Sequence, residues 1–154
     1  MKRFIAWITG GIDLPTWPAE VGLLLLRCYA GLSLFLTVGR GRFDIRTGQI
    51  DPVFMSMIHT LNLPAPMFFA ALAIFTETVG ALLLAGGLGT RLWALMLTVT
   101  LSLAAFAINR VHFYRELHVT QLLFWVFVCF IAIGSGRLSL DSVLRKWLSR
   151  RKTL

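Results

Sequence analysis

The stretch VGLLLLRCYAGLSLFLTV, residues 21–38, is apolar over a length that can span a bilayer, and its one charged residue is Arg27. A second apolar stretch, residues 66–86, holds one charged residue of the opposite sign, Glu77. A charge at membrane depth costs several kcal/mol unless it is paired or hydrated. The two stretches therefore predict a membrane protein whose spanning helices carry an intramembrane ion pair between Arg27 and Glu77.

The composition favours the same class of protein. Of the 154 residues, 57% are hydrophobic and only 14% are charged, and a soluble domain of this size has no interior large enough for so much apolar surface. The net charge of +8 comes largely from basic residues near the two ends, Lys2, Arg3 and several residues within 145–152. These clusters indicate binding to a bilayer with anionic headgroups and do not favour nucleic acid as a partner.

The predicted fold class is an all-α membrane protein, a bundle of four transmembrane helices in a single domain, residues 1–154. Four stretches are long enough to span, at about 20–38, 66–86, 90–108 and 117–135. Because the number of spans is even, both termini lie on one side. The basic ends place that side in the cytoplasm, giving an N-in, C-in topology.

Two shorter helices are expected outside the spans. The segment from Asp51–Pro52 to Leu61 has amphipathic spacing and predicts a short interfacial helix on the outer face. After the fourth span, glycines end the helix, and Ser139 or Asp141 is placed to cap an amphipathic helix on the inner surface. The glycine-rich turn at residues 86–89 makes the second and third spans antiparallel neighbours.

Counting inward from the cytoplasmic ends places Arg27 and Glu77 at similar depth. Arg27 is seven residues from Glu20 and Glu77 is nine from Gly86, so their depths differ by only ~3 Å. Small residues would allow the two helices to approach closely; these are Gly31, Ala73 and Gly80. The pair has two interpretations: it fixes the register of the helices, or it lines a polar cavity or relays protons.

A second polar group is predicted at the outer end of the fourth span. His118, Gln121 and Trp125 follow i, i+3, i+7 spacing, and Asn109 and Arg115 lie nearby in the sequence. A quinone headgroup needs donors to its carbonyls and an aromatic wall, and His118 is suited to move a proton. The alternative interpretation is that these residues are ordinary interfacial anchors.

The remaining residue types that often carry chemistry give no further site. Cys28 and Cys129 lie in different spans without a Cys-x-x-Cys motif, and we expect them to pack as small apolar residues. The three histidines are scattered, so no metal site is expected. The 86–89 turn joins two membrane helices and follows no strand, so it does not qualify as a nucleotide-binding loop.

Several segments together resemble the DoxX family of small bacterial four-helix membrane proteins. They are Arg27 with Gly31, Asn62–Leu63–Pro64, Glu77 with Gly80, Gly87–Leu88–Gly89–Thr90–Arg91, and the ending Gly134–x–Gly136–Arg137–Leu138–Ser139–Leu140–Asp141. The Ser–Leu–Asp ending is the most specific of these. The chain departs from the family pattern at residues 39–43, where Gly–Arg–Gly–Arg–Phe replaces the usual glycine and lysine arrangement.

The resemblance implies a bacterial inner-membrane protein associated with redox systems, because relatives are linked to thiosulfate:quinone oxidoreductase and to complexes that handle thiols and peroxide stress. It does not imply catalysis by this chain. Two hypotheses follow. Either the chain is a non-catalytic or quinone-interacting subunit that docks an oxidoreductase partner, or it is a structural or transport-like module for a small solute, without redox chemistry.

Overall fold

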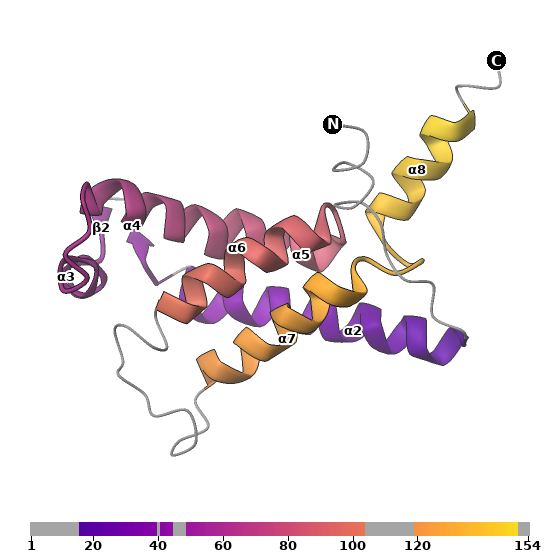
Figure 1. Cartoon of the computed structure of the whole chain (residues 1–154), viewed down its shortest axis with the longest axis horizontal. Helices are drawn as coiled ribbons and strands as arrows, with labels where there is room; N and C mark the ends of the chain where they lie inside the picture. Colours follow the sequence, from indigo (N-terminus) through magenta and orange to yellow (C-terminus); the bar gives the residue numbers. More distant parts are fainter. Residues whose placement is uncertain (1–15, 40, 45–48, 104–118, 151–154) are drawn as a thin grey trace.

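The computed structural model describes residues 16–39, 41–44, 49–103 and 119–150, and these are mostly helical (Figure 1). Two segments, η1 and η2, are π-helical turns inserted between or after α-helices. In chain order the elements are α2 (Trp17–Leu34), η1 (Phe35–Gly39), β1 (Phe43–Asp44), β2 (Gln49–Ile50), α3 (Pro52–His59), α4 (Pro66–Phe75), η2 (Thr76–Gly80), α5 (Ala81–Gly86), α6 (Thr90–Ser102), α7 (Val119–Ile133) and α8 (Leu140–Arg150).

Four long helical segments run side by side (Figure 1). The first is α2 with η1, and the second is α4, η2 and α5; within them Trp17–Thr37 and Pro66–Gly86 are long and apolar enough to cross a membrane. Prolines in the first turns of α2 and α4 suit these helix starts. The predicted helices at 20–38 and 66–86 are therefore confirmed. α6 and α7 cover the described parts of 90–108 and 117–135, while 104–118 lie outside the described residues.

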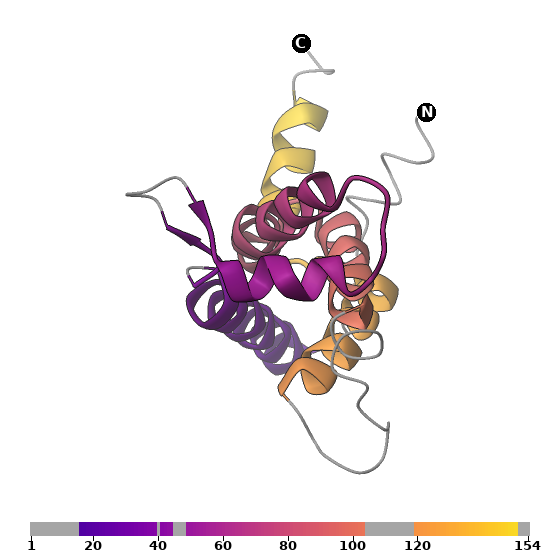
Figure 2. The same cartoon turned by 90° about the vertical axis from the view of Figure 1, so that its left-hand side faces the viewer.

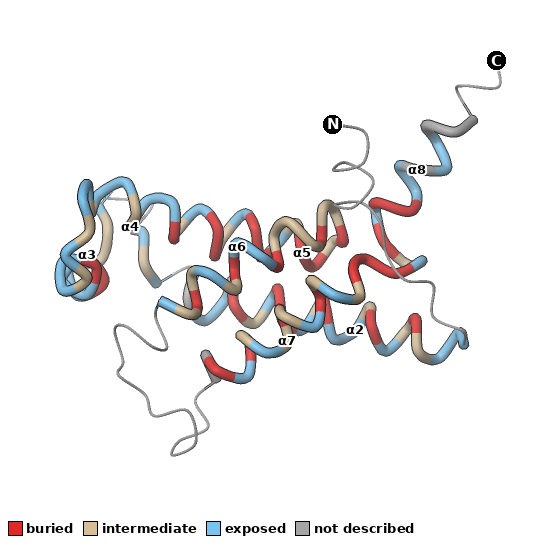
Figure 3. Tube along the Cα trace, in the orientation of Figure 1, coloured by how far each residue is buried: buried red, intermediate tan, exposed pale blue. Residues whose placement is uncertain are grey.

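The core lies where α2, α5, α6 and α7 face one another, and buried positions gather on these inward faces (Figure 3). Its members are Leu23, Ala30, Leu34, Ala81, Leu84, Ala94, Leu97, Leu101, Leu123, Phe127 and Phe130. Large apolar side chains such as Leu25, Tyr29 and Phe68 are exposed on the outward faces. An outer surface of this kind is typical of helices that face lipid.

Small residues allow the helices to pack closely. Of the three predicted at the contact between the first two long helices, only Gly31 lies there. Gly31 packs against the backbone of Ala81, so the predicted close approach of the first two helices is confirmed there. Gly80 instead lies under the ring of Trp93 in α6. Ala73 belongs to a separate small core between α3 and α4.

Two glycines of α2 give a matched test of this packing. In Gly31→Ala the new Cβ would lie 2.5 Å from the Ala81 carbonyl oxygen, so the helices must separate, and we expect a loss of about 1–3 kcal/mol. In Gly22→Ala nothing lies within 4 Å, and the higher helix propensity of alanine should add about 0.5–1 kcal/mol. The thermal unfolding midpoint in detergent measures both. Equal midpoints for the two variants would contradict this account of the helix contact.

At one end of the bundle α3 lies across the helices as a cap (Figure 2). Asp51 begins it by accepting a hydrogen bond from the Phe54 N–H at 3.1 Å, and Phe54 and Ile58 bury their side chains against α4. The predicted short helix after Asp51 is thus confirmed. The small antiparallel pair of β1 and β2, with Phe43 opposite Ile50, was not predicted.

At the opposite end α8 turns away from the direction of the bundle (Figures 1 and 2). Gly134 and Gly136 have φ of 84° and 67°, a conformation that suits glycine, and they redirect the chain after α7. Ser139 then caps α8 by accepting a hydrogen bond from the Ser142 N–H at 3.2 Å. The predicted C-terminal helix and its serine cap are confirmed.

Candidate functional site

Arg27 is held at the end of the bundle nearest α8, where its guanidinium binds backbone carbonyls from two other segments. Nε donates to the Ala85 carbonyl at 3.3 Å, Nη2 donates to Leu138 at 2.8 Å, and Nη1 donates to Ser135. The residue is only 1% exposed. One arginine thus joins α2, α5 and the α7–α8 connection.

The predicted ion pair between Arg27 and Glu77 is wrong. Arg27 binds Ala85, eight residues beyond Glu77 along the second helix, which is ~12 Å further along the axis. The prediction assumed that the inner ends of the two helices lie level. Instead α2 continues past the end of α5, and the guanidinium reaches Gly87, where an added Cβ would lie 2.7 Å from Arg27 Cζ.

The C-terminal motif, residues 134–141, completes this junction. The Asp141 carboxylate accepts the Gly89 N–H at 2.9 Å, at the N-terminus of α6, where a helix dipole favours a negative charge. Glu20 of α2 accepts the Arg137 N–H at 2.8 Å, and an added Cβ at Gly136 would lie 2.9 Å from the Glu20 Oε2. Together with the turn at Gly134 and the cap at Ser139, these contacts make the motif a structural joint.

Glu77 has a different partner, Arg42, which lies between η1 and β1. Arg42 Nη1 and Glu77 Oε2 are 2.6 Å apart; Glu77 is fully buried and the Arg42 side chain is 22% exposed. Arg42 engages Oε2 directly, whereas Oε1 has no hydrogen-bond partner among the residues that the structure describes. Burial lowers the pKa of Arg42, and the Glu77 carboxylate opposes that shift. The pair therefore joins a buried carboxylate, with Oε1 still able to accept a hydrogen bond, to a partly exposed arginine.

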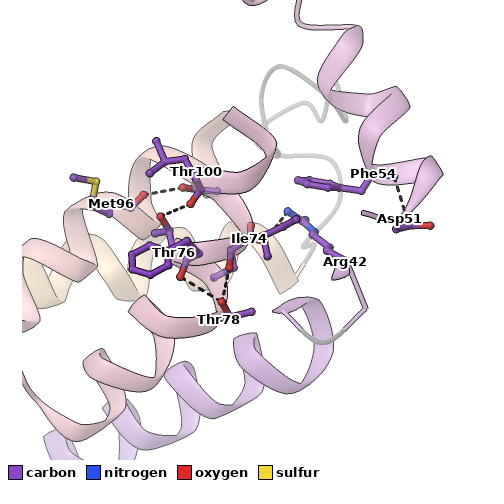
Figure 4. Close-up of polar contacts among 11 residues, drawn as sticks. Arg42, Asp51, Phe54, Ile74, Thr76, Thr78, Met96 and Thr100 are labelled. Carbon is purple, nitrogen blue, oxygen red and sulfur yellow. Dashed lines mark hydrogen bonds and ion pairs between the residues drawn. The ribbon is translucent and has the colours of Figure 1, made fainter. Parts of the chain in front are cut away.

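The cap helix α3 and the segment before β1 position Arg42 (Figure 4). Its guanidinium carbon lies 4.1 Å from the centre of the Phe54 ring, a cation–π contact. Its carbonyl accepts the Asp51 N–H at 3.0 Å, which ties Arg42 to the start of α3. These contacts with α3 therefore hold the Arg42 guanidinium next to the buried Glu77 carboxylate.

Glu77 lies in the π-helical turn η2, which contacts η1 on the neighbouring helix. Widened turns of this kind interrupt the regular hydrogen-bond ladder and are frequent at functional sites. Here Thr76 donates to the Leu72 carbonyl at 2.7 Å, and Thr78 donates to the Ile74 carbonyl at 2.6 Å (Figure 4). We call Arg42, Glu77 and Phe54 the outer site.

Sequence reasoning placed Glu77 correctly in a buried position but missed Arg42. A signal was present, because Arg42 lies in residues 39–43, where the chain departs from the DoxX pattern. An arginine directly after the first span can reach back to a carboxylate in the outer half of the second. Counting residues inward from Glu20 and Gly86 compares only residues inside the two helices, so it does not consider Arg42 as a partner of Glu77.

The polar group predicted at the start of α7 is described only in part. His118, Asn109 and Arg115 lie outside the described residues. Gln121 is buried, and its Nε2 has no hydrogen-bond partner among the residues that the structure describes. Trp125 is half exposed, with its ring against Phe124 at 5.3 Å between centroids, a position typical of an interfacial anchor.

The two cysteines are not joined to each other. Cys28 is half-buried with Sγ 3.6 Å from the Ala85 carbonyl oxygen, whereas Cys129 is exposed. Within the described ranges no three His, Cys, Asp or Glu side chains gather where they could hold a metal ion.

Comparison with known proteins identifies the family of the chain. The family model named DoxX matches residues 22–110, more than half of the chain, from α2 through α6, and the match includes Arg27, Arg42 and Glu77. No curated protein and no solved structure gives a significant match. The chain belongs to the DoxX family of membrane proteins.

Proposed function

We propose that the chain crosses the bacterial inner membrane four times with both ends in the cytoplasm. Support comes from the four helical segments lying side by side, the apolar side chains on their outward faces, and the basic residues near both termini. In this placement α3 and the outer site lie toward the periplasm. Arg27 and the C-terminal motif lie at the cytoplasmic end.

Within that placement the protein serves as a non-catalytic, quinone-interacting subunit of a membrane redox system, beside an oxidoreductase partner subunit that handles thiols, sulfur compounds or oxidative stress. The observation that carries this proposal is the outer site. Glu77 is a fully buried carboxylate in a spanning helix; its Oε2 is joined to a partly exposed arginine, and its Oε1 has no hydrogen-bond partner among the described residues. Intramembrane ionisable groups of this kind usually mark substrate or proton pathways.

The residues of the outer site match the chemistry of a quinone headgroup. Arg42 has N–H donors beyond those in its ion pair, and these suit the carbonyl oxygens of the ring. Glu77 can accept a hydrogen bond from a hydroxyl and exchange a proton with it at Oε1. Phe54 adds an aromatic face next to Arg42. A bound quinone would supply two-electron, two-proton redox chemistry.

Quinone retention tests the proposal. The full chain, purified in lipid nanodiscs, should retain ubiquinone or menaquinone after washing, and Glu77→Gln should weaken binding about tenfold through loss of a charged hydrogen-bond partner. Thr78→Val is the matched control, because the Thr78 hydroxyl bonds to carbonyls of its own helix. Extraction and mass spectrometry measure the quinone, and size-exclusion chromatography checks folding. Folded wild-type protein that binds no quinone in any lipid would refute the proposal.

A second candidate is a transport-like module for a small solute, and one observation favours it. The Arg42 side chain is 22% exposed while Glu77 is fully buried, so Arg42 connects the surface to the interior carboxylate. A folded protein without quinone affinity, together with uptake of a solute into proteoliposomes that Glu77→Gln abolishes, would support this function instead.

A further inference from the structure

The contacts that hold the C-terminal helix α8 to the bundle lie near its beginning. Asp141 N–H donates to the Gly87 carbonyl at 3.1 Å, the Asp141 carboxylate binds the Gly89 N–H, and Asp141 and Ser142 are buried. From there α8 projects sideways past the helices (Figures 1 and 2). A helix that leaves the end of a spanning bundle at an angle to its axis is placed to lie along the membrane surface.

The projecting part of α8 presents an exposed apolar face. Its members follow the i, i+3, i+4, i+7 spacing of one side of a helix; they are Leu140, Val143, Leu144 and Trp147. The helix has 11 residues, shorter than the ~12–15 that an isolated helix needs for marginal stability in water. An apolar surface must therefore cover this face for α8 to persist.

The net charge of residues 140–154 indicates what kind of surface covers the apolar face of α8. The sequence from 140 to 154 contains five basic residues, Arg145, Lys146, Arg150, Arg151 and Lys152, and one acidic residue, Asp141. Asp141 is already engaged with the Gly89 N–H at the bundle end. The rest of α8, with Arg145, Lys146 and Arg150, is a cationic, amphipathic helix, and Arg151 and Lys152 follow it in the sequence. This charge matches a bilayer surface rich in anionic lipid better than an uncharged one.

We propose that α8 is a lipid-binding element that lies in the cytoplasmic surface of the membrane, with its apolar face in the acyl boundary and its basic residues on anionic headgroups. The joint at Arg27 and Asp141 sets its direction. The inference uses the membrane placement proposed above and is independent of the quinone site, so a failure of quinone retention leaves it unaffected.

Site-directed spin labels on the full chain test the depth of α8. In a background with Cys28→Ala and Cys129→Ala, single labels are placed through Leu144→Cys and Lys146→Cys, two exposed positions on opposite sides of the helix. In nanodiscs of phosphatidylcholine and phosphatidylglycerol, the label at 144 should be accessible to oxygen and protected from a water-soluble nickel chelate. The label at 146 should show the reverse pattern.

The role of anionic lipid is tested by changing the lipid and the charges separately. Removing phosphatidylglycerol should reduce the protection of the label at 144. Arg145→Gln, Lys146→Gln and Arg150→Gln together should weaken this dependence on phosphatidylglycerol, because they remove three of the five basic residues. Arg91→Gln, which removes a basic residue near the same bundle end but outside α8, should leave it unchanged.

Three results would overturn the proposal. If the label at 144 is open to the nickel chelate in every lipid, α8 lies in water. If it is shielded from both reagents, protein covers the apolar face, and a second copy of the chain becomes the occupant. If its protection is the same with and without phosphatidylglycerol, the surface does not select anionic lipid.

Discussion

Arg27→Gln is expected to cause a severe loss of folded protein. The substitution removes donors from the carbonyls of Ala85, Ser135 and Leu138, and the glutamine amide is too short to replace all three bonds. It also removes the positive charge near Glu20 and Asp141. Breaking a buried charged network of this kind costs about 3–5 kcal/mol. Fluorescence-detected size-exclusion chromatography and the thermal midpoint in detergent measure the loss.

Two other arginine variants distinguish the contribution of the hydrogen bonds to stability from that of the positive charge. Arg27→Lys keeps a positive charge but lacks the planar fork that reaches several acceptors, so its loss should be intermediate. Arg91→Gln removes an exposed bond to the Ala132 carbonyl, and its cost should stay below about 1 kcal/mol. A wild-type midpoint for Arg27→Gln would show that the junction does not depend on the guanidinium.

At the outer site, substitution of Arg42 is expected to destabilise the protein much more than substitution of Glu77. Arg42→Gln leaves Glu77 as a fully buried carboxylate without its counter-charge, and we expect a loss of about 3–5 kcal/mol. Glu77→Gln leaves Arg42, whose partly exposed side chain can turn toward water, and the loss should be about 1–2 kcal/mol. The double variant should be more stable than Arg42→Gln alone. The thermal unfolding midpoints of the two single variants and the double variant, compared with wild type, measure the interaction between Arg42 and Glu77.

A second double variant checks the identity of the partner. Because Arg27 bonds to Ala85, Ser135 and Leu138 and not to Glu77, the effects of Arg27→Gln and Glu77→Gln should add. Rescue of Glu77→Gln by Arg27→Gln, with no rescue by Arg42→Gln, would restore the pairing expected from the sequence and refute the outer site.

The helices were predictable from the sequence because their boundaries carry local signals. Pro66 begins the second long helix, the glycines at 86–89 end it, and Ser139 caps the last one; each acts through its own backbone conformation or hydrogen bond. The length of each apolar run predicts the length of its helix, whatever the neighbouring helix is. The burial of Arg27 and Glu77 followed for the same reason, since a charge within such a run has few ways to reach water.

The partners of these charges were not predictable in the same way, because they depend on how far one helix slides past another. Gly31 against Ala81 sets that register, and a count from assumed level ends misses it by about six residues, because it places Arg27 level with residue 79 instead of Ala85. Arg42 was missed because its position depends on the β1–β2 pair and on Phe54, contacts that hydropathy does not encode. The carbonyls of Ser135 and Leu138 lie in a turn without regular structure, which carries no periodic signal.

The junction at Arg27 also has a consequence for biosynthesis. Arg27 lies in α2, but its acceptors at Ser135 and Leu138 follow it in the sequence by 108 and 111 residues. During translation the arginine therefore has no access to these carbonyls until the last long helix has been made. A chain truncated before residue 135 lacks two of the three carbonyls that bind this charge in the folded protein. Arg27 thereby makes completion of the polypeptide a condition for a stable bundle.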